Sequence, residues 1–352
     1  MRVFLHIASL FYLGLTRLRL LCYQLNFLKK YVFDIPVVSV GNITVGGTGK
    51  TPMIIYLSQL LTKQNIKHVI VSRGYKKTAR GTLVVQDYDK KHINNPIIAG
   101  DEPVMLTYKL DNIPIIVDSN KSRGIALAIR RFCPKVVLLD DGFQSLYIDK
   151  KMDFLLIDNS LPITQYQLMP KGRLREPLLA LERSDCVIFL NKGRENYLIK
   201  KMIVPMLNKQ TIPYIDASFK SKLYQHNYNT QSLEKYDSGE VSELSCVAIS
   251  GIGNAQSFID QAKSLCNILK NYSFPDHYNY SKNEDFFDAI VCKQERRGDI
   301  NTAFGIITTL KDYVKIVQLP CVQLKKHSLY VIDINLVTDD ENKLLELILR
   351  EG

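Results

Sequence analysis

Residues 36–52 read PVVSVGNITVGGTGKTP and connect an apolar, strand-forming run to an apolar helical pattern through a glycine-rich turn. The turn ends in Gly49-Lys50-Thr51. In loops of this kind the backbone N–H groups gather around a phosphate chain, the lysine reaches the β/γ-phosphate oxygens and the threonine hydroxyl ligates Mg²⁺. The positive end of the helix that begins near Pro52 faces the same anion. The sequence therefore predicts a phosphate-binding loop of the P-loop type.

This loop departs from the usual spacing at one position. A glycine ordinarily stands five residues before the glycine of Gly-Lys-Thr, and this chain has Thr44 there. A glycine-rich turn without a ligand is the alternative interpretation. The residues that we expect to surround the phosphates are Thr44, Val45, Gly46, Gly47, Thr48, Gly49, Lys50 and Thr51.

The composition is that of a globular protein large enough for two domains, with 352 residues, 46% hydrophobic and 23% charged. The formal net charge of +11 suggests an anionic partner, namely a phosphorylated substrate, a membrane surface or nucleic acid. No nucleic-acid-binding signature supports the last of these, so we expect no nucleic-acid partner, and no protein partner is evident. The seven cysteines form no Cys-x-x-Cys pair, which favours a reducing compartment over a disulfide framework or a zinc site.

The N-terminus is strongly apolar. Its charge-free run from Val3 to Thr16 is 14 residues long, whereas a membrane span needs about 20. Arg17 and Arg19 interrupt the apolar pattern, and two lysines follow it. This arrangement favours a membrane-associating helix within residues 1–35 that lies in the interface. A cleaved signal peptide and an ordinary core-packing helix are the alternatives.

From Asp34 onward, β-branched runs alternate with helical patterns, which predicts a mainly parallel sheet flanked by helices. Ligands of such sheets bind at the carboxyl ends of the strands. The predicted strands are Pro36–Val40, His68–Ser72, Thr82–Gln86, Pro114–Val117, Lys135–Leu139, Met152–Ile157 and Cys186–Asn191. The predicted helices are Thr51–Lys63, Glu102–Tyr108, Lys121–Phe132 and Arg194–Leu207.

A second, smaller α/β domain is predicted beyond this core. Residues 217–245 are polar and irregular, which favours a linker with an entry strand. Strand Cys246–Ser250, helix Asn254–Leu269 and strand Phe304–Ile307 follow. We therefore expect a P-loop core over 36–216 and a smaller domain over 217–352, the last part of which could pack back on the core.

The strand at Lys135–Leu139 runs into the carboxylates Asp140 and Asp141. P-loop proteins deliver a metal-organising acid in this way, opposite the loop threonine. We assign Asp140 with Thr51 to the metal, and Asp141 to a metal-bound water or a substrate group. A solvated pair of carboxylates at a strand end is the alternative interpretation.

Four further motifs carry candidate functional residues. Arg73 offers a planar fork suited to phosphate, and Arg175 lies in a basic, proline-rich segment that could present cations to an anion. Asp101 could cap a helix or accept a proton from an attacking hydroxyl. His277 stands beside an acid in the second domain. A solvated basic loop and a purely structural histidine are the alternatives for Arg175 and His277.

Together these motifs resemble one family, the tetraacyldisaccharide 4′-kinases (lipid A 4′-kinases). The resemblance runs from the apolar N-terminus to about residue 315. Its motifs, in chain order, are Gly41-Asn42 with Val45–Pro52, Ser72–Tyr75, Gly100–Pro103, Asp140–Gln144, Leu174–Pro177, Phe274–His277 and Lys311-Asp312.

The resemblance implies a membrane-associated kinase on the cytoplasmic face of the inner membrane. Such an enzyme uses ATP and Mg²⁺ to phosphorylate the 4′-hydroxyl of a tetraacylated glucosamine disaccharide 1-phosphate, which completes lipid IVA in lipid A biosynthesis. It also implies that Asp101 and His277 form a dyad that activates the hydroxyl, a role that suits their chemistry. A lipid with four acyl chains cannot leave the bilayer cheaply, so the enzyme must work at the membrane surface.

The remaining site residues follow from the same resemblance. Lys50, Arg175 and Arg123 would neutralise the transferring phosphoryl group, while Arg73 and Tyr75 would face the lipid head group. We place Arg123 and Glu176 among the substrate-binding residues as well. The chain departs from the family where Ser145 and Tyr278 replace residues that are commonly histidine, which leaves His277 as the candidate in its motif.

A P-loop GTPase or metallochaperone-type switch is the alternative function. Asn191-Lys192-Gly193-Arg194 occupies the place where such proteins carry Asn-Lys-x-Asp. The aspartate of that motif accepts hydrogen bonds from guanine, and Arg194 cannot accept any. This residue favours the kinase.

Overall fold

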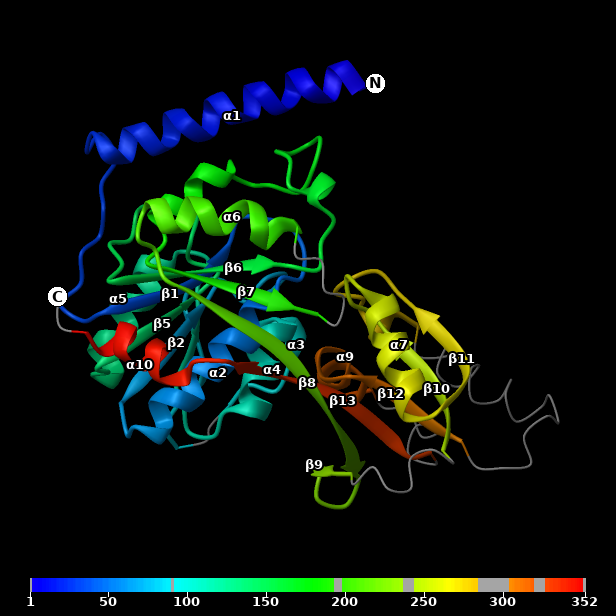
Figure 1. The fold of residues 1–352 in the computed structure, drawn as a ribbon. Coiled ribbons are helices and arrows are strands. Elements are labelled where there is room, and N and C mark those ends of the chain that lie inside the picture. The colour runs from blue at the N-terminus through cyan, green and yellow to red at the C-terminus, as the bar shows by residue number, and fades with distance from the viewer. Residues whose placement is uncertain are drawn as a thin grey trace.

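The computed structural model of the protein describes residues 2–89, 92–192, 198–236, 244–283, 304–319 and 327–350. Within them a single sheet of 13 strands extends through the molecule in the order β11-β10-β12-β13-β8-β7-β6-β1-β5-β2-β4-β3, with β9 paired to β8 (Figure 1). The strands are β1 (Val37–Asn42), β2 (His68–Ser72), β3 (Leu83–Gln86), β4 (Ile115–Val117), β5 (Val136–Asp140), β6 (Met152–Asp158), β7 (Cys186–Asn191), β8 (Tyr214–Asn227), β9 (Ser232–Lys235), β10 (Ser245–Ser250), β11 (Asn267–Ser273), β12 (Gly305–Thr309) and β13 (Leu329–Thr338).

Helices lie along both sides of this sheet (Figure 1). They are α1 (Arg2–Gln24), α2 (Lys50–Lys63), α3 (Pro96–Ala99), α4 (Asp101–Lys109), α5 (Lys121–Phe132), α6 (Leu198–Lys209), α7 (Ala255–Leu265), α9 (Leu310–Ile316) and α10 (Glu341–Leu349), together with the 3-10 turns η1 (Ile163–Gln165), η2 (Leu178–Arg183) and η4 (Tyr280–Asn283). Neighbouring strands are parallel except for β3 with β4 and for β8 with both β9 and β13. The predicted mainly parallel α/β sheet is therefore confirmed.

Each strand predicted within the core over 36–216 forms within two residues of its expected bounds. The start of the helix predicted over Arg194–Leu207 lies outside the described residues, and the described part, α6, runs to Lys209. The helix predicted over Asn254–Leu269 ends earlier, because α7 stops at Leu265 and Asn267 begins β11. β11 was not predicted because its residues are mostly polar. It lies at the edge of the sheet, where a strand does not need alternating apolar residues.

The prediction of a linker with an entry strand over residues 217–245 is wrong where β8 and β9 form, and residues 237–243 of that range lie outside the described residues. β8 occupies Tyr214–Asn227 and pairs with β13 from Ala217 opposite Thr338 to Gln225 opposite Tyr330. Polar side chains mislead here because much of this long strand is only partly buried. β8 also pairs with β7, the last strand of the core that was predicted over 36–216. The sheet is thus continuous across residue 216, and the division into 1–35, 36–216 and 217–352 stays a prediction.

One apolar core lies under α2 and is shared by distant parts of the chain. Met53, Leu57 and Leu60 of α2 are fully buried against the sheet, and Leu344 and Ile348 of α10 join the same cluster. Burial of side chains of this size is worth about 1.5–3 kcal/mol each. The helix that starts at the phosphate-binding loop is therefore held firmly along its length.

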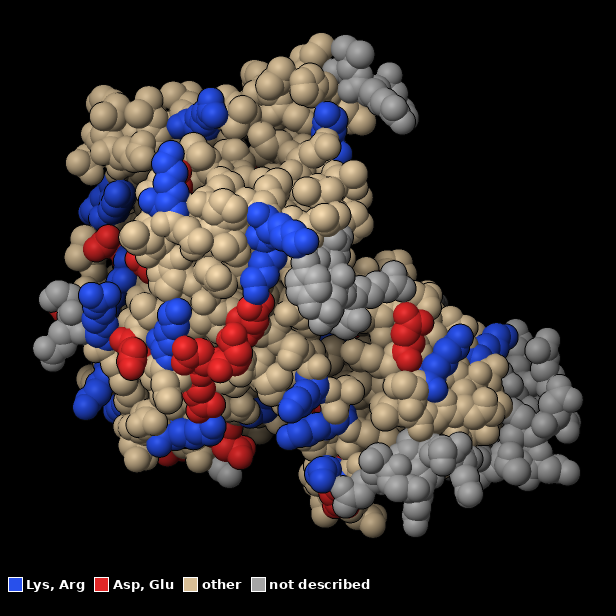
Figure 2. Space-filling model, viewed as in Figure 1, with Lys and Arg blue, Asp and Glu red and all other residues tan. Residues whose placement is uncertain are grey.

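Helix α1 lies apart from the sheet, across one end of the molecule (Figure 1). It is attached on one face, where Ser9 Oγ donates to Leu168 O at 3.1 Å, Tyr12 OH to Arg175 O at 2.8 Å and Arg19 Nη2 to Gln144 O at 3.0 Å. In Figure 2 this end of the molecule is mostly free of charged side chains, with basic side chains on it and just below it.

The opposite face of α1 is an exposed apolar stripe with helical spacing, formed by Phe4, Ile7, Phe11, Leu15 and Leu18. Residues Phe4–Gln24 have a mean hydropathy of 1.3 and are long and apolar enough to cross a membrane by length and composition. The helix is thus longer than the 14-residue charge-free run suggested, because the helical pattern continues past Arg17 and Arg19.

Candidate active site

The phosphate-binding loop connects β1 to α2, as the sequence predicts. Gly49 precedes the helix with φ +84°, a left-handed conformation that favours glycine. Asn42, fully buried at the end of β1, fixes the loop from inside: its Nδ2 donates to Thr44 O and to Thr48 Oγ1, both at 2.6 Å. Lys50 Nζ lies 3.4 Å from Asn42 Oδ1. The loop is therefore held in shape by the protein itself.

A second segment supports the loop from the side. Val45 N donates to Arg173 O at 2.8 Å and Arg175 N donates to Ile43 O at 2.7 Å, so that residues 173–175 run alongside the loop. Lys192 Nζ donates to Gly47 O at 2.6 Å and pairs with Asp158 Oδ2 at 2.5 Å. The basic, proline-rich segment is thus placed at the phosphate site.

Two cationic side chains of this region lie close to the carboxylate of Asp141. Its Oδ1 lies 3.5 Å from Lys50 Nζ and 3.4 Å from Arg175 Nη1. Burial alone would raise the pKa of Asp141, but the nearby Lys50, Lys121 and Arg175 outweigh it, and the pKa lies below the ordinary value. Asp141 is therefore an anion that aligns two of the cations predicted to contact phosphate.

Lys121 stabilises the turn at Asp140 and Asp141 through the backbone. Its ammonium donates to the backbone carbonyl of Asp141 and lies 3.4 Å from Ser145 Oγ. Burial lowers the pKa of Lys121 to about 8, although Asp141 and Asp140 attract its charge. Ser145, one of the departures from the family pattern, is thus in contact with a buried lysine.

Asp140 ends β5 directly beside β1, where Val40 is its partner in the register. Its Oδ2 accepts a hydrogen bond from Ser72 Oγ at 3.1 Å, while its Oδ1 is buried without a hydrogen-bond partner. Burial, together with the neighbouring charges of Glu102 and Asp141, raises the pKa of Asp140 to about 6. A buried carboxylate oxygen with no hydrogen-bond donor can bind a cation, so Asp140 fits a metal ligand.

No cluster of three or more His, Cys, Asp or Glu side chains suited to a metal occurs among the described residues. Mg²⁺ is usually held by one or two carboxylates together with substrate phosphates and waters. The donor set here, Asp140 with the hydroxyl of Thr51 at the start of α2, suits that ion.

The structure brings Asp101 and His277 into direct contact although they are 176 residues apart in the sequence. His277 Nδ1 lies 2.7 Å from Asp101 Oδ2 and 3.0 Å from Oδ1. Both side chains are largely buried. Burial acts to raise the pKa of Asp101, but the hydrogen bond from His277 and the charge of Lys311 bring it below the ordinary value. The carboxylate is therefore ionised and accepts from Nδ1–H, which leaves Nε2 as the proton-accepting atom of a neutral ring.

Asp101 does not occupy the cap position of α4, although its Oδ1 accepts a hydrogen bond from Glu102 N in the first turn at 3.0 Å. It is the first residue of α4, and Gly100 at the cap position makes no side-chain cap bond. His277 has a φ of +60° in the turn after β11, a strained conformation for a residue with a side chain. The fold thus holds the His277 side chain against the local preference of its backbone.

Lys311 and Glu102 connect the dyad to the phosphate site. Lys311 Nζ lies 3.2 Å from His277 Nε2, 3.0 Å from Asp276 Oδ1 and 3.7 Å from Glu102 Oε1. Glu102 also contributes to the raised pKa of Asp140 by its charge. The dyad and the Asp140–Asp141 turn therefore belong to one electrostatic site.

Of the residues predicted to bind the acceptor, Tyr75 lies beside the dyad and Glu176 lies near Arg175, whereas Arg123 contacts neither. The ring of Tyr75 is 4.9 Å from that of His277 and is half exposed. Arg73 is exposed just before it. Arg123 forms a two-point pair with Asp118, with Nε at 2.7 Å and Nη2 at 2.8 Å. Glu176 already accepts from Gln144 at 3.1 Å and from Arg183 at 2.8 Å.

Sequence reasoning assigned no role to several residues that the structure places at the site. These residues are Asn42, Glu102, Lys121, Lys192 and Lys311. Asn42, Glu102 and Lys311 belong to the motifs quoted for the family resemblance, and this membership could have marked them as candidate site residues. Lys192 stands in the segment compared with Asn-Lys-x-Asp, which gave no sign of its contact with Gly47, and Lys121 is a lysine at the start of a helix. The contacts of both depend on the tertiary fold.

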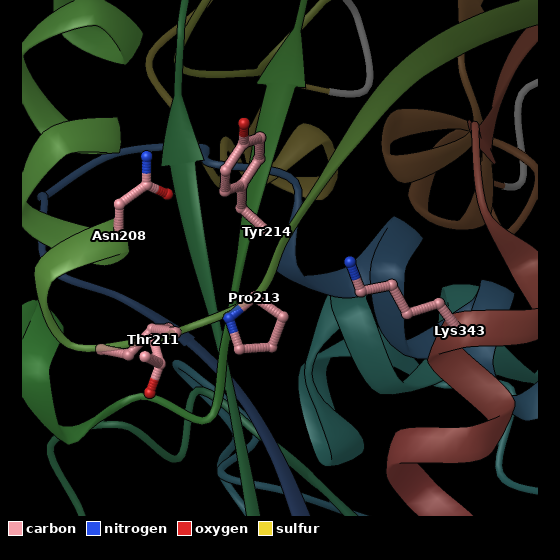
Figure 3. A pocket seen from close by; sticks show the side chains of 6 residues that line it. Asn208, Thr211, Pro213, Tyr214 and Lys343 are labelled. Atoms are coloured by element: carbon pink, nitrogen blue, oxygen red, sulfur yellow. The ribbon is translucent and has the colours of Figure 1, made fainter.

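A hollow of about 580 Å³ lies elsewhere, where α6 ends, β8 begins and α10 passes (Figure 3). Thr211, Pro213, Tyr214 and Lys343 are among its lining residues. Because β8 begins here and runs parallel to β7, the hollow is at the amino edge of the strands, whereas the phosphate-binding loop follows the carboxyl end of β1. We therefore assign no part of the chemistry to it.

The profile of the tetraacyldisaccharide-1-P 4′-kinase family matches residues 1–351 of the chain. The chain belongs to this family. A tetraacyldisaccharide 4′-kinase of Halothermothrix orenii is 35% identical over 323 residues, which cover 88% of this chain and 82% of the relative. The corresponding kinase of Desulfatibacillum aliphaticivorans is 32% identical over 318 residues, covering 89% and 83%.

The fold agrees with that of a solved family member. The crystal structure of LpxK from Aquifex aeolicus in complex with ATP matches with a TM-score of 0.74 and 27% identity, covering 97% of this chain and 96% of that one. The expected fold class and the expected kinase function in lipid A biosynthesis are therefore confirmed. The choice between a kinase and a GTPase-type switch is decided in favour of the kinase.

Proposed function

We propose that this kinase transfers the γ-phosphate of ATP to the 4′-hydroxyl of a tetraacylated glucosamine disaccharide 1-phosphate, with the Asp101–His277 dyad as the base. The observation that carries the proposal is the 2.7 Å contact between His277 Nδ1 and Asp101 Oδ2, in the same electrostatic site as the phosphate-binding loop. An ionised aspartate orients the ring, so that His277 Nε2 takes the hydroxyl proton as the oxygen attacks phosphorus.

The phosphate-binding loop would hold the nucleotide. In our proposal the backbone of residues 44–49 surrounds the phosphates, and Lys50 with Arg175 neutralises charge that develops on the transferring group. The contacts of both cations with Asp141 support this role, because the carboxylate aligns them before the nucleotide arrives. Phosphoryl transfer depends mainly on such positioning and charge neutralisation.

Thr51 and Asp140 would hold Mg²⁺, in agreement with the buried and unpartnered Oδ1 of Asp140. When bound, the ion supplies positive charge to the phosphate oxygens. The hydrogen bond from Ser72 Oγ to Asp140 Oδ2 at 3.1 Å orients the carboxylate and leaves its other oxygen free of protein donors, so that Oδ1 would be the atom that binds the ion.

The acceptor would approach over Tyr75, whose half-exposed ring lies beside His277. We propose that Arg73 and Arg123 contact its anionic head group. Arg123 keeps a more than half-exposed side chain while its charge is aimed by the buried Asp118. Glu176 has both carboxylate oxygens occupied by protein donors, so we propose that it acts on the acceptor by shaping the segment that carries Arg175.

The exposed stripe of α1 would bind the cytoplasmic face of the inner membrane as a monotopic anchor. The hydrogen bonds of Ser9, Tyr12 and Arg19 hold the opposite face of the helix against the protein, and this two-faced arrangement supports an interfacial helix over a membrane-crossing one. The net charge of +11 would strengthen attraction to anionic lipid. The segment 1–35 would then be a membrane unit, 36–216 the nucleotide core and 217–352 a smaller domain that contributes His277.

The direct test is incubation of the full-length protein with ATP, Mg²⁺ and the tetraacylated disaccharide 1-phosphate in vesicles, followed by mass spectrometry of the lipid. We expect a mass gain of one phosphate, placed at the 4′ position by fragmentation, and loss of the product when EDTA replaces Mg²⁺. Lys50→Ala is the matched inactive variant. Transfer at the full rate in EDTA would refute the metal assignment, and a product phosphorylated elsewhere would refute the proposed acceptor position.

A further inference from the structure

Lys311 holds a position that the proposed mechanism does not account for. Its ammonium lies 3.2 Å from His277 Nε2, which is the atom that the mechanism needs as the proton acceptor. Because His277 Nδ1 donates to Asp101, Nε2 carries the lone pair of the neutral ring, and an ammonium can only donate to it. In this structure the base is therefore already occupied by a protein donor.

The surroundings of Lys311 allow it to release that bond without becoming unpaired. Asp276 Oδ1 lies 3.0 Å and Glu102 Oε1 3.7 Å from the same Nζ atom, and Asp101 Oδ2 lies at 4.0 Å. These carboxylates raise the pKa of Lys311 above its ordinary value although burial acts to lower it. A hydroxyl that competes for Nε2 would displace a lysine that keeps at least two anionic partners.

Kinases with an exposed base face a competing reaction with water. If His277 Nε2 took a proton from water, the water oxygen would attack the γ-phosphorus, the bond to the β-phosphate oxygen would break, and ADP with inorganic phosphate would leave. A sugar hydroxyl held by a bound acceptor has a high effective concentration at the base, whereas free water has no such advantage. A donor seated on Nε2 therefore suppresses hydrolysis more strongly than transfer.

We propose that Lys311 covers the proton-accepting atom of His277 until the acceptor hydroxyl replaces it, and thereby suppresses the transfer of phosphate from ATP to water. The proposal rests on the proposed role of the dyad as base. Lys311 is a positioning residue in this account, because it acts through His277. This role explains why the ammonium of Lys311 lies at the atom of His277 that the substrate hydroxyl must reach.

The experiment measures two rates on the full-length enzyme: release of inorganic phosphate from ATP without lipid, and transfer to the lipid acceptor. For Lys311→Met we expect the ratio of hydrolysis to transfer to rise about tenfold, the factor that corresponds to loss of one charge-assisted hydrogen bond. Lys311→Arg keeps a donor and should stay near the wild-type ratio. A purely structural role would lower both rates together and leave the ratio unchanged.

The matched control is Lys315→Met. Lys315 is one helical turn further along α9 and lies 3.9 Å from Asp101 Oδ2, so its loss removes a similar charge without uncovering Nε2. We expect its ratio of hydrolysis to transfer to stay at the wild-type value. If Lys315→Met raises the ratio as much as Lys311→Met does, charge alone is responsible and the proposal is wrong.

The double variant Lys311→Met/His277→Ala separates this inference from the proposed function. If Lys311 covers the base, the additional hydrolysis disappears when His277 is removed. An unchanged ratio in Lys311→Met, with His277→Ala inactive in transfer, would overturn the inference and leave the dyad intact. Full transfer in His277→Ala would overturn the dyad itself. Should Lys311→Met fail to fold by circular dichroism, Lys311→Leu, which also carries no hydrogen-bond donor, decides the question with the same two rates.

Discussion

His277 Nδ1 lies 2.7 Å from Asp101 Oδ2 although the two residues come from opposite halves of the chain. Asp101 begins α4 beside the phosphate site, and His277 follows β11 at the far edge of the sheet. The sheet continues between them through β8 and β13. The proposed base thus forms only when the two halves are in the relative position seen here, so its activity should be sensitive to how those halves are arranged.

The dyad should behave as one unit in kinetics. We expect Asp101→Ala and His277→Ala each to lower kcat by at least about 10²-fold, because each removes part of the base. ATP affinity should change less, since neither side chain is assigned to the nucleotide. The double variant should be little worse than either single variant. Losses that multiply fully would show that the two residues act independently.

The phosphate site should depend on Lys50 more than on any other loop side chain. We expect Lys50→Ala to lower kcat by about 10²-fold or more, as for other preorganised charge contacts. Thr51→Ala should instead raise the Mg²⁺ concentration needed for half-maximal activity. The measurement is a titration of steady-state transfer with ATP and with Mg²⁺. Activity like that of the wild type in Lys50→Ala would contradict the P-loop assignment.

Asn42 should set the affinity for the nucleotide although it touches no phosphate in our proposal. Its Nδ2 fixes Thr44 O and Thr48 Oγ1 from inside the fold. Asn42→Ala leaves both oxygens buried without that donor, which costs about 1–3 kcal/mol and loosens the loop. We expect the KM for ATP to rise about tenfold or more, and Asn267→Ala on the exposed edge strand to leave it unchanged. An unaltered KM for ATP in Asn42→Ala would show that the loop keeps its shape without this residue.

How far the sequence predicts this site depends on the distance over which each contact acts. The loop residues 44–51 and the Asp140–Asp141 turn are local patterns at strand ends, and the fold places them as expected. The pairing of Asp101 with His277 could be reached only through a family resemblance, because nothing local links residues 176 positions apart. Lys192 on Gly47 and Lys121 under Asp141 are contacts of the same long-range kind.

The long strand β8 shows the other limit of sequence patterns. Its residues Phe219–Lys222 look like a polar linker, yet they pair with Asp333–Leu336 of β13. Backbone hydrogen bonds carry that pairing, and they leave no periodic signal when both faces are partly exposed. Composition therefore indicates burial better than it indicates strand structure, and a connecting strand between two halves is hard to predict.

The buried His68 should make stability fall at mildly acidic pH. Its Nδ1 donates to Ile66 O at 2.8 Å, so Nε2 accepts from Ser58 Oγ at 2.7 Å in the neutral ring. Burial lowers the pKa of His68 below its ordinary value of 6.5. Between the two pKa values the unfolded chain binds more protons than the folded one, so the free energy of unfolding decreases as pH drops below about 6.5, by up to about 1.4 kcal/mol per pH unit.

The test is urea unfolding at pH 7.5 and 5.5 for the wild type, His68→Gln and His6→Gln. We expect His68→Gln to be less stable at pH 7.5 but to lose less stability on acidification than the wild type does. His6→Gln removes an exposed histidine and should keep the wild-type difference. Equal losses in all three proteins would place the acid sensitivity in other groups.

Membrane binding should depend on the outward stripe of α1 and not on the contacts that hold the helix to the protein. Phe11 is 70% and Leu18 58% exposed, so Phe11→Glu/Leu18→Glu puts two charges into the face that would enter the lipid. We expect this variant, like deletion of residues 1–28, to stop floating with vesicles that contain anionic lipid.

Tyr12→Phe is the matched control, because it removes only the 2.8 Å bond to Arg175 O on the inward face. It should float like the wild type, and any loss of transfer in it would reflect Arg175 alone. Flotation should also weaken at high salt, since Arg17 and Arg19 lie within the helix. If the double glutamate variant floats as well as the intact protein, the stripe is not the membrane contact and another surface must bring the kinase to its lipid.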